Sequence, residues 1–213
     1  MRSEKILEML NNGKIEDLKV ALQDEIYTES LKKKPDAKKR YSAMKKYFTY
    51  CDSGREILQK PCEVEIDGQK LNAFTNSYSL ALTRETCGEI AMCEDPARYP
   101  QVARIISYKG NEGKIDFAKV IAEAKSKGYK LKKSEFDLFN YKYLMHYEGS
   151  YFKIGLIEAT YGIIDDGKEA IVYHVEGNGK PITITTDIGV CVVMPVRYDG
   201  DPVADGKVVI EVK

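Results

Sequence analysis

Residues 41–83 read YSAMKKYFTYCDSGREILQKPCEVEIDGQKLNAFTNSYSLALT, and the hydrophobic period changes within this stretch. Its first part has apolar side chains at helical spacing, which predicts a helix over 37–51. The side chains on that face are Tyr41, Met44, Tyr47 and Phe48. The second part holds three short alternating runs, PCEVEID, KLNAFTN and YSLALT, separated by Asp-Gly and Asn-Ser pairs. This pattern predicts a β-meander that follows the helix directly.

The same plan occurs again over residues 151–196. A helix is predicted over 153–164, an acidic Asp-Asp-Gly turn follows, and EAIVYHV, PITITT and GVCVVMPV read as strands. Residues 40–84 and 151–196 share this order of elements but almost no identical residues. We therefore expect an α+β fold in which two helix-plus-meander halves join edge to edge into a continuous antiparallel sheet, with the helices on one face.

The remaining segments complete a four-part division of the chain. Apolar spacing predicts N-terminal helices over 3–11 and 15–31, and a further helix over 115–127 that Gly128 ends. Strand-like runs lie at 135–147 and in KVVIEV near the C-terminus. The parts are an N-terminal helical extension (1–36), a first half with its connector (37–107), a second half (108–198) and a tail strand (199–213).

Composition limits the function classes. The chain has 213 residues with 33 basic and 33 acidic side chains, and no apolar run reaches the length of a membrane span. The N-terminus lacks the apolar core of a signal peptide, and the five cysteines form an odd, scattered set. We expect a cytoplasmic protein that does not contact membranes.

No motif predicts a catalytic, metal or cofactor site. His146 and His174 lie in predicted strands without a recognisable partner motif, and Cys87 and Cys93 are too far apart for a Cys-x-x-Cys pair. The acidic turn around Asp165 lacks the ligand spacing of a calcium loop, and YKGNEGKIDF lacks the features of a phosphate loop. We interpret the histidines as structural or surface residues and the cysteines as buried thiols.

Basic residues concentrate in two stretches. Between residues 30 and 60, ten basic residues face three acidic ones, and eight lysines lie between Lys109 and Lys133. On the helix predicted over 37–51, the exposed surface would carry Lys38, Lys39, Lys45 and Lys46. Such a stripe can hold a phosphate backbone without reading bases, or it can simply keep a surface helix soluble.

Three segments resemble the bacterial DNA sliding clamp, the DNA polymerase III β subunit family. In that family a helix leads to an arginine shortly before a leucine, and strands then end in a T-D-G-x-R-L motif. Arg55 and Leu58 stand in the first two places, and residues 75–80, TNSYSL, stand in place of the motif. Asn76 and Ser77 replace its aspartate and glycine, and Ser79 replaces its arginine.

The other two segments follow in the family's order. ARYPQVARII (97–106) is similar to a family connector through Tyr99, Pro100 and Arg104. Residues 151–197 are similar to the end of the closing clamp domain. The matching residues there are Pro181, Ile184, Met194, Pro195 and Arg197. The family chain ends soon after its Met-Pro-x-Arg, whereas this chain continues with YDGDPVADGKVVIEVK.

The resemblance implies a non-enzymatic processivity protein of DNA replication, in a short form such as phages and mobile elements carry. Clamps line a ring with helices, so double-stranded DNA bound without sequence preference would be the main partner. The residues expected at the DNA are Lys38, Lys39, Lys45, Lys46, Arg55, Lys125, Lys127, Lys132 and Lys133, with Lys130 in the same stretch. One chain cannot enclose a duplex, so the resemblance also implies a homo-oligomer.

A DNA polymerase or another replication protein is the expected protein partner. In the family the C-terminal residues border the pocket that receives polymerase peptides; because of the added tail, no partner-binding residues are assigned here. Two other classes stay open from the sequence: an enzyme of unrecognised type on an α+β scaffold, and an interaction module without DNA contact.

Overall fold

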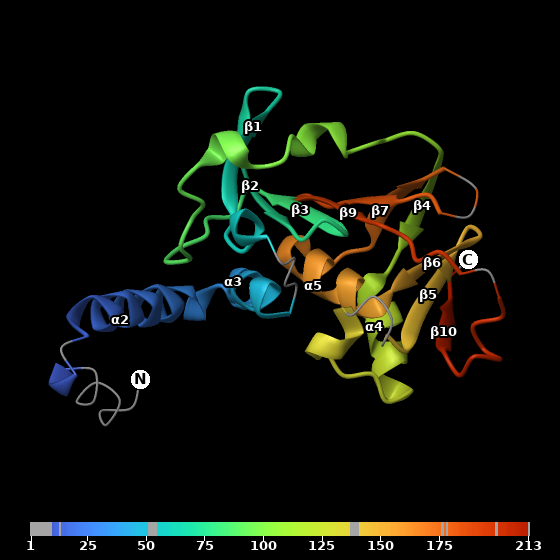
Figure 1. Cartoon of the computed structure of the whole chain (residues 1–213), viewed down its shortest axis with the longest axis horizontal. Helices are drawn as coiled ribbons and strands as arrows, with labels where there is room; N and C mark the ends of the chain where they lie inside the picture. Colours follow the sequence, from blue (N-terminus) through green and yellow to red (C-terminus); the bar gives the residue numbers. More distant parts are fainter. Residues whose placement is uncertain are drawn as a thin grey trace.

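A computed structural model describes residues 10–12, 14–50, 55–136, 141–175, 177, 179–198 and 200–212. Its main feature is a seven-stranded antiparallel sheet in the order β1-β2-β3-β9-β8-β7-β4 (Figure 1). The strands are β1 (Cys62–Ile66), β2 (Gln69–Thr75), β3 (Ser79–Thr83), β4 (Asn111–Ile115), β7 (Ala170–His174), β8 (Ile182–Thr185) and β9 (Gly189–Val193). The chain is therefore α+β, as expected.

The two predicted meanders meet where β3 pairs with β9. The antiparallel register runs from Ser79 opposite Val193 to Thr83 opposite Gly189. Where Thr83 lies opposite Gly189, the two backbones are very close. A Cβ atom on Gly189 would collide there with the carbonyl oxygen of Leu82. Glycine is needed here for backbone approach rather than for its dihedral freedom.

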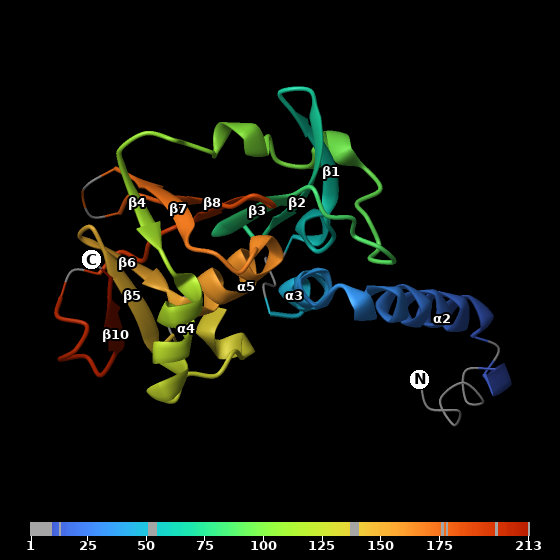
Figure 2. The ribbon, with the colours of Figure 1, turned by 180° about the vertical axis from the view of Figure 1, so that it is seen from behind.

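Three helices lie in a layer on one side of this sheet (Figures 1 and 2). They are α3 (Pro35–Tyr50), α4 (Phe117–Ser126) and α5 (Ile154–Ile164). The α5 sequence, IGLIEATYGII, is apolar on nearly every side, and the helix contacts the sheet, α3 and α4 at once. Gly162 lets α3 approach closely, since a Cβ atom there would lie 3.3 Å from the Cβ of Ala43.

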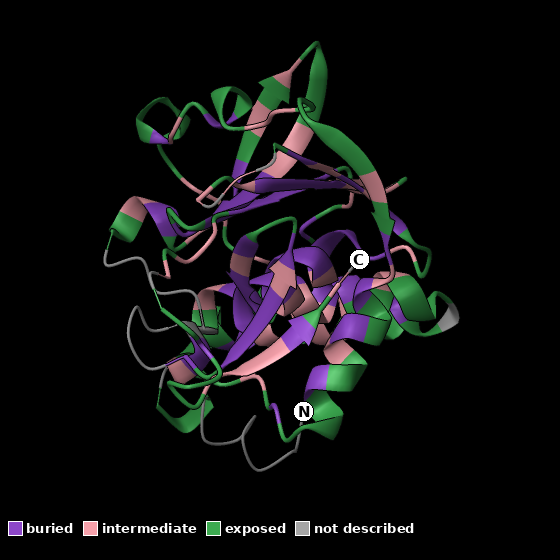
Figure 3. Cartoon of the chain, turned by 90° about the vertical axis from the view of Figure 1, so that its right-hand side faces the viewer, coloured by how far each residue is buried: buried purple, intermediate pink, exposed green. Residues whose placement is uncertain are grey.

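The buried residues lie mainly between sheet and helices (Figure 3). On α3, Tyr41, Met44 and Tyr47 point into this core, as their spacing predicts. A smaller apolar cluster covers the opposite face of the sheet beneath the 84–110 connector, which contains η3 (Pro96–Arg98) and η4 (Val102–Arg104).

A second, three-stranded sheet holds the C-terminal tail. β5 (Tyr143–Tyr147) pairs with β6 (Ser150–Lys153), and β10 (Val208–Glu211) pairs with β5 in parallel. The tail strand is confirmed, but it is integrated into the second half rather than separate from it.

The predicted helix over 15–31 is α2 (Ile15–Ser30), which projects from the body as an arm (Figure 1). At its base, the Tyr41 hydroxyl donates to Asp24 at 2.6 Å and the Tyr27 and Tyr41 rings meet edge to face. The helix predicted over 3–11 lies mostly outside the described residues.

Two predicted boundaries are wrong. The helix predicted over 115–127 begins only at Phe117, because Asn111–Ile115 forms β4 at the edge of the sheet. The strand predicted over 135–147 starts at Tyr143; residues before it form η5 (Lys133–Phe136), and 137–140 lie outside the described residues. In the described part of the chain, no helix is both long and apolar enough to cross a membrane.

Candidate functional site

A pocket opens on the connector side of the main sheet, where four segments distant in sequence meet. Its volume is about 170 Å³. Arg55 and Leu58 line it from the segment before β1, residues 75 and 77–80 from the β2–β3 turn, Pro100 and Ile105 from the connector, and Val192 and Met194 from the end of β9 and the residue after it. We call this the convergence pocket.

The β2–β3 turn that forms one wall is held by Asn76. Its side-chain oxygen accepts hydrogen bonds from the backbone N–H of Tyr78 at 3.0 Å and of Ser79 at 2.8 Å, and from the Ser79 hydroxyl at 3.1 Å. Asn76 is buried, and Ser77 has a φ of 76°, a left-handed value that favours glycine. Asn76 and Ser77 thus form the tight turn, at the two positions that correspond to aspartate and glycine in the clamp-family motif.

The connector wall is fixed by Tyr99. The Tyr99 ring is buried in the smaller apolar cluster, and its hydroxyl donates to the carbonyl oxygen of Ala73 at 3.0 Å. Burial raises the pKa of this tyrosine, so it stays a neutral donor. Tyr99 therefore anchors the connector to β2 and places the next residue, Pro100, at the pocket.

The pocket has an apolar floor and an apolar rim. Leu58, Leu80 and Val192 are fully buried beneath it, whereas Met194 is 39% and Ile105 40% exposed at its edge. Exposed apolar side chains around a small apolar cavity are typical of a surface that receives apolar side chains of a partner. Arg55 brings one positively charged side chain to this otherwise apolar and neutral lining.

The expected DNA-binding lysines on α3 are all exposed, on the side of the sheet opposite the convergence pocket. Lys39 forms an ion pair with Asp165 at 2.5 Å, and Lys45 forms one with Asp24 of α2 at 2.8 Å. Within the described residues, no ion pair joins Lys38 or Lys46 to an acidic side chain. The charges of two of the four lysines, Lys39 and Lys45, are thus balanced by a carboxylate.

The second lysine stretch lies at and after α4. Lys125 is paired with Glu158 of α5 at 2.7 Å and Lys127 with Glu123 at 2.8 Å, while Lys132 and Lys133 follow as exposed residues. The Lys127–Glu123 pair is exposed and therefore weak, so phosphate groups can compete for Lys127, whereas the Glu158 side chain that holds Lys125 is only 18% exposed.

A groove between α3 and α5 brings several of these residues together. Lys39, Lys46, Glu158 and Leu131 line it, and its volume is about 270 Å³. Lys125 reaches the same groove through Glu158, and Lys132 and Lys133 adjoin Leu131 in the chain. Arg55 is elsewhere, at the convergence pocket.

The two lysine stretches are separated by the central helix of the core. The helix of the second half, α5, carries no lysine and lies between α3 and α4. The lysine-bearing helices α3 and α4 therefore flank a buried apolar helix. The reason is that α5 fills the centre of the core, where charged side chains would lose their hydration.

The two histidines occupy different environments, and neither lines the convergence pocket or the groove. The His146 imidazole contacts the Glu211 carboxylate at 2.7 Å across the β5–β10 pair. His174 is buried, and its ring lies edge to face against Tyr147 and Phe152. Among the described residues, no group of three or more His, Cys, Asp or Glu side chains is placed to hold a metal ion.

The sequence marks these residues only as parts of separate segments, and it does not predict that they line one cavity. They are Arg55, Leu58, residues 75–80, Pro100 and Met194. Their spatial meeting depends on the β3–β9 pairing and on the Tyr99 anchor, which are long-range contacts. The signal available in the sequence was the order of the three segments that resemble the clamp family.

No family model matches this chain, and neither does any curated protein or solved structure.

Proposed function

We propose that this protein is a sliding-clamp-like processivity factor that acts without catalysis, holding duplex DNA on its helix side and a replication partner at the convergence pocket. The observation that carries the proposal is the pocket itself. Each of the three segments that resemble the clamp family contributes to its lining. The match between resemblance and geometry is informative because the segments are far apart in the chain.

The C-terminal tail is compatible with this role. In the clamp family that this chain resembles, the C-terminal residues border a pocket for polymerase peptides, so an extension of the chain could fill that pocket. Here β10 instead pairs with β5 in the small sheet, and none of the described tail residues, 200–212, lines the convergence pocket. Met194 is left at the rim, where a peptide from a DNA polymerase or another replication protein can reach it.

The DNA-binding part of the proposal rests on the lysines of α3 and of the α4 region. They lie on the helix layer, so a duplex placed there meets side chains and not sheet edges. Lysines that contact phosphates without reading bases give binding that depends on salt and not on sequence, which suits a protein that moves along DNA.

Enclosure of DNA requires more than one chain. The main sheet ends in the edge strands β1 and β4, and pairing of these unlike edges between copies generates a ring where the rotation from copy to copy closes. The proposed assembly is therefore a homo-oligomer whose helix layers face the centre.

The test combines solution mass with DNA topology. Light scattering is expected to give a mass of several chains. After incubation with nicked circular or linearised plasmid and a high-salt wash, protein is expected to remain on the circle and to leave the linear DNA. A monomeric mass with equal retention on both plasmids would contradict the proposal.

A further inference from the structure

Two cysteines that the function does not use lie next to each other where the connector meets the edge of the main sheet. Cys62 is the first residue of β1, and Cys93 belongs to the connector. The backbone N–H of Cys93 donates to the carbonyl oxygen of Pro61 at 2.7 Å, so the two chain segments run in direct contact. Both side chains pack into the same apolar cluster.

The two thiols also interact with each other. Burial raises the pKa of the Cys62 thiol to about 11, and the nearby Cys93 side chain adds to this rise. Cys62 has no exposed surface, whereas Cys93 is half-buried. One thiol of the pair is therefore accessible and the other is not.

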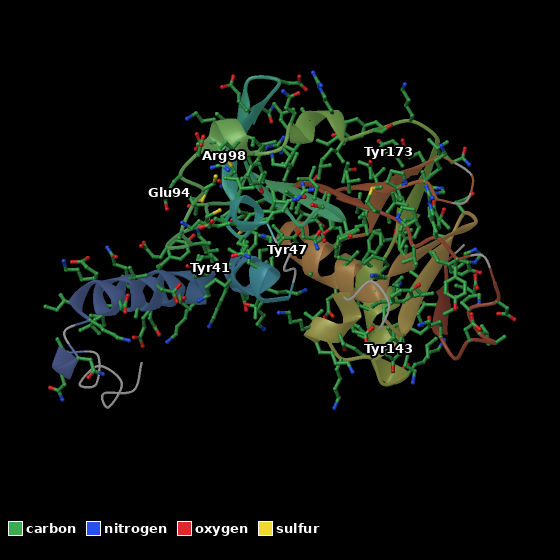
Figure 4. All side chains as sticks on the ribbon, in the orientation of Figure 1. Tyr41, Tyr47, Glu94, Arg98, Tyr143 and Tyr173 are labelled. Carbon is green, nitrogen blue, oxygen red and sulfur yellow. The ribbon has the colours of Figure 1, made fainter. Side chains whose placement is uncertain are left out.

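The accessible thiol borders a second cavity, of about 240 Å³, whose lining carries both charges: Lys60 and Arg98 together with the carboxylates of Glu56 and Asp95. Glu94 also lines it and is ion-paired with Lys60 at 2.7 Å. Figure 4 shows Glu94 and Arg98 together on the connector beside β1. Cys93 is therefore within reach of a small disulfide that enters this cavity from solvent.

We infer that Cys62 and Cys93 are a modification site that forms an intramolecular disulfide by exchange with a small disulfide such as oxidised glutathione. The Cys93 thiolate attacks one sulfur of glutathione disulfide, forms a mixed disulfide and releases one glutathione thiolate. The Cys62 thiol then loses its proton and attacks the Cys93 sulfur, releasing the second glutathione. Two protein thiols are oxidised, one glutathione disulfide is reduced to two thiols, and no other reactant is needed.

The disulfide would tie the connector to the edge strand. It closes the chain between residues 62 and 93, which includes β2, β3 and the start of the connector. The inference does not depend on the proposed function, because it concerns only the chemistry of the two thiols.

The experiment is an oxidised glutathione titration of the full-length protein, followed by intact mass and tryptic peptide analysis. Wild type is expected to lose two hydrogens and two titratable thiols. C93S is expected to lose no hydrogens and to keep the Cys62 thiol titratable. C62S is expected to stop at the mixed disulfide, with one glutathione added. One tryptic peptide, residues 85–98, holds both Cys87 and Cys93. The variant C87S therefore assigns the cross-link and should react like wild type.

C191S is the matched control, since Cys191 is buried in the main core. The inference is overturned if wild type accumulates a stable glutathione adduct on Cys93 without a disulfide. It is equally overturned if the cross-link persists in C93S, or if C87S abolishes it.

Discussion

At the scale of single residues, Asn76 shows how one side chain shapes the candidate site. Its carboxamide oxygen accepts three hydrogen bonds within the β2–β3 turn, and the side chain is buried. A buried turn that loses its acceptor leaves N–H groups without partners, at a cost of about 1–3 kcal/mol.

We therefore expect Asn76→Ala to lower the free energy of unfolding by about 2 kcal/mol in urea titrations followed by circular dichroism. Asn76→Asp keeps the accepting oxygen and is expected to stay within about 1 kcal/mol of wild type. Equal stability of N76A and wild type would mean that the backbone holds the turn alone.

His174 links stability to pH. The imidazole is buried against Tyr147 and Phe152, and this burial lowers its pKa below the usual value of 6.5. The folded protein therefore keeps His174 neutral, while the unfolded chain binds a proton below about pH 6.5. The contribution to stability is fully present above that pH and is lost as the pH falls toward the folded-state pKa.

The expected result is a steeper loss of stability below about pH 6.5 in wild type than in His174→Phe, by up to about 1.4 kcal/mol per pH unit. Urea unfolding at several pH values measures it. Parallel curves for wild type and H174F would contradict this explanation.

At the scale of elements, α3 presents the lysines on which the DNA-binding proposal depends. Lys38 and Lys46 are the useful pair for a test. Lys39 and Lys45 pair with Asp165 and Asp24, so reversing their charge would also place like charges together.

Lys38→Glu with Lys46→Glu is expected to weaken binding of a labelled duplex at least ~10-fold at low salt and to reduce the salt slope by about 2. Fluorescence anisotropy over a salt series measures both. The matched control reverses Lys114 of β4 and Lys180 just before β8, two exposed lysines that form no ion pair with an acidic side chain among the described residues, with the same change in net charge. If both double variants weaken binding equally, only net charge matters and α3 has no special role.

The elements also show what the sequence could and could not predict. The helices at 15–31, 37–51 and 153–164 and both meanders were predictable, because their apolar residues recur at one clear period. β4 was not, because NEGKI has a single fully buried residue, Ile115, at its end, and no alternation marks it as a strand. The parallel β5–β10 pairing was also hidden, since it joins segments more than sixty residues apart.

For the site, the sequence predicted the ingredients but not their assembly. The lysines of α3 could be assigned to a surface from helical spacing alone. The convergence pocket could not, because its lining depends on which edges of the two meanders pair and on how Tyr99 folds the connector back onto β2.

At the scale of the whole molecule, the main sheet separates two surfaces. The convergence pocket lies on its connector side, above Leu58, Leu80 and Val192, and the lysine-bearing helices lie on the other side. The smaller apolar cluster and the large core are distinct sets of side chains on either face of the sheet. Substitutions far apart with no shared partners usually act independently, so each surface can be altered alone.

This separation predicts variants that lose one activity and keep the other. Peptides are first selected for wild-type binding from a random heptapeptide library. Met194→Lys with Ile105→Glu places charges on the apolar rim and is expected to weaken their binding at least ~10-fold, because a charge in the contact loses hydration without a partner. Duplex affinity should stay within about twofold, since both residues are partly exposed and lie away from the lysines.

Val203→Lys, at an exposed apolar residue of the tail, is the control and should change neither peptide binding nor duplex affinity. Selected peptides that bind the rim variant as well as wild type would move the docking site away from the convergence pocket, whereas loss of both activities would mean that the two faces of the sheet are coupled.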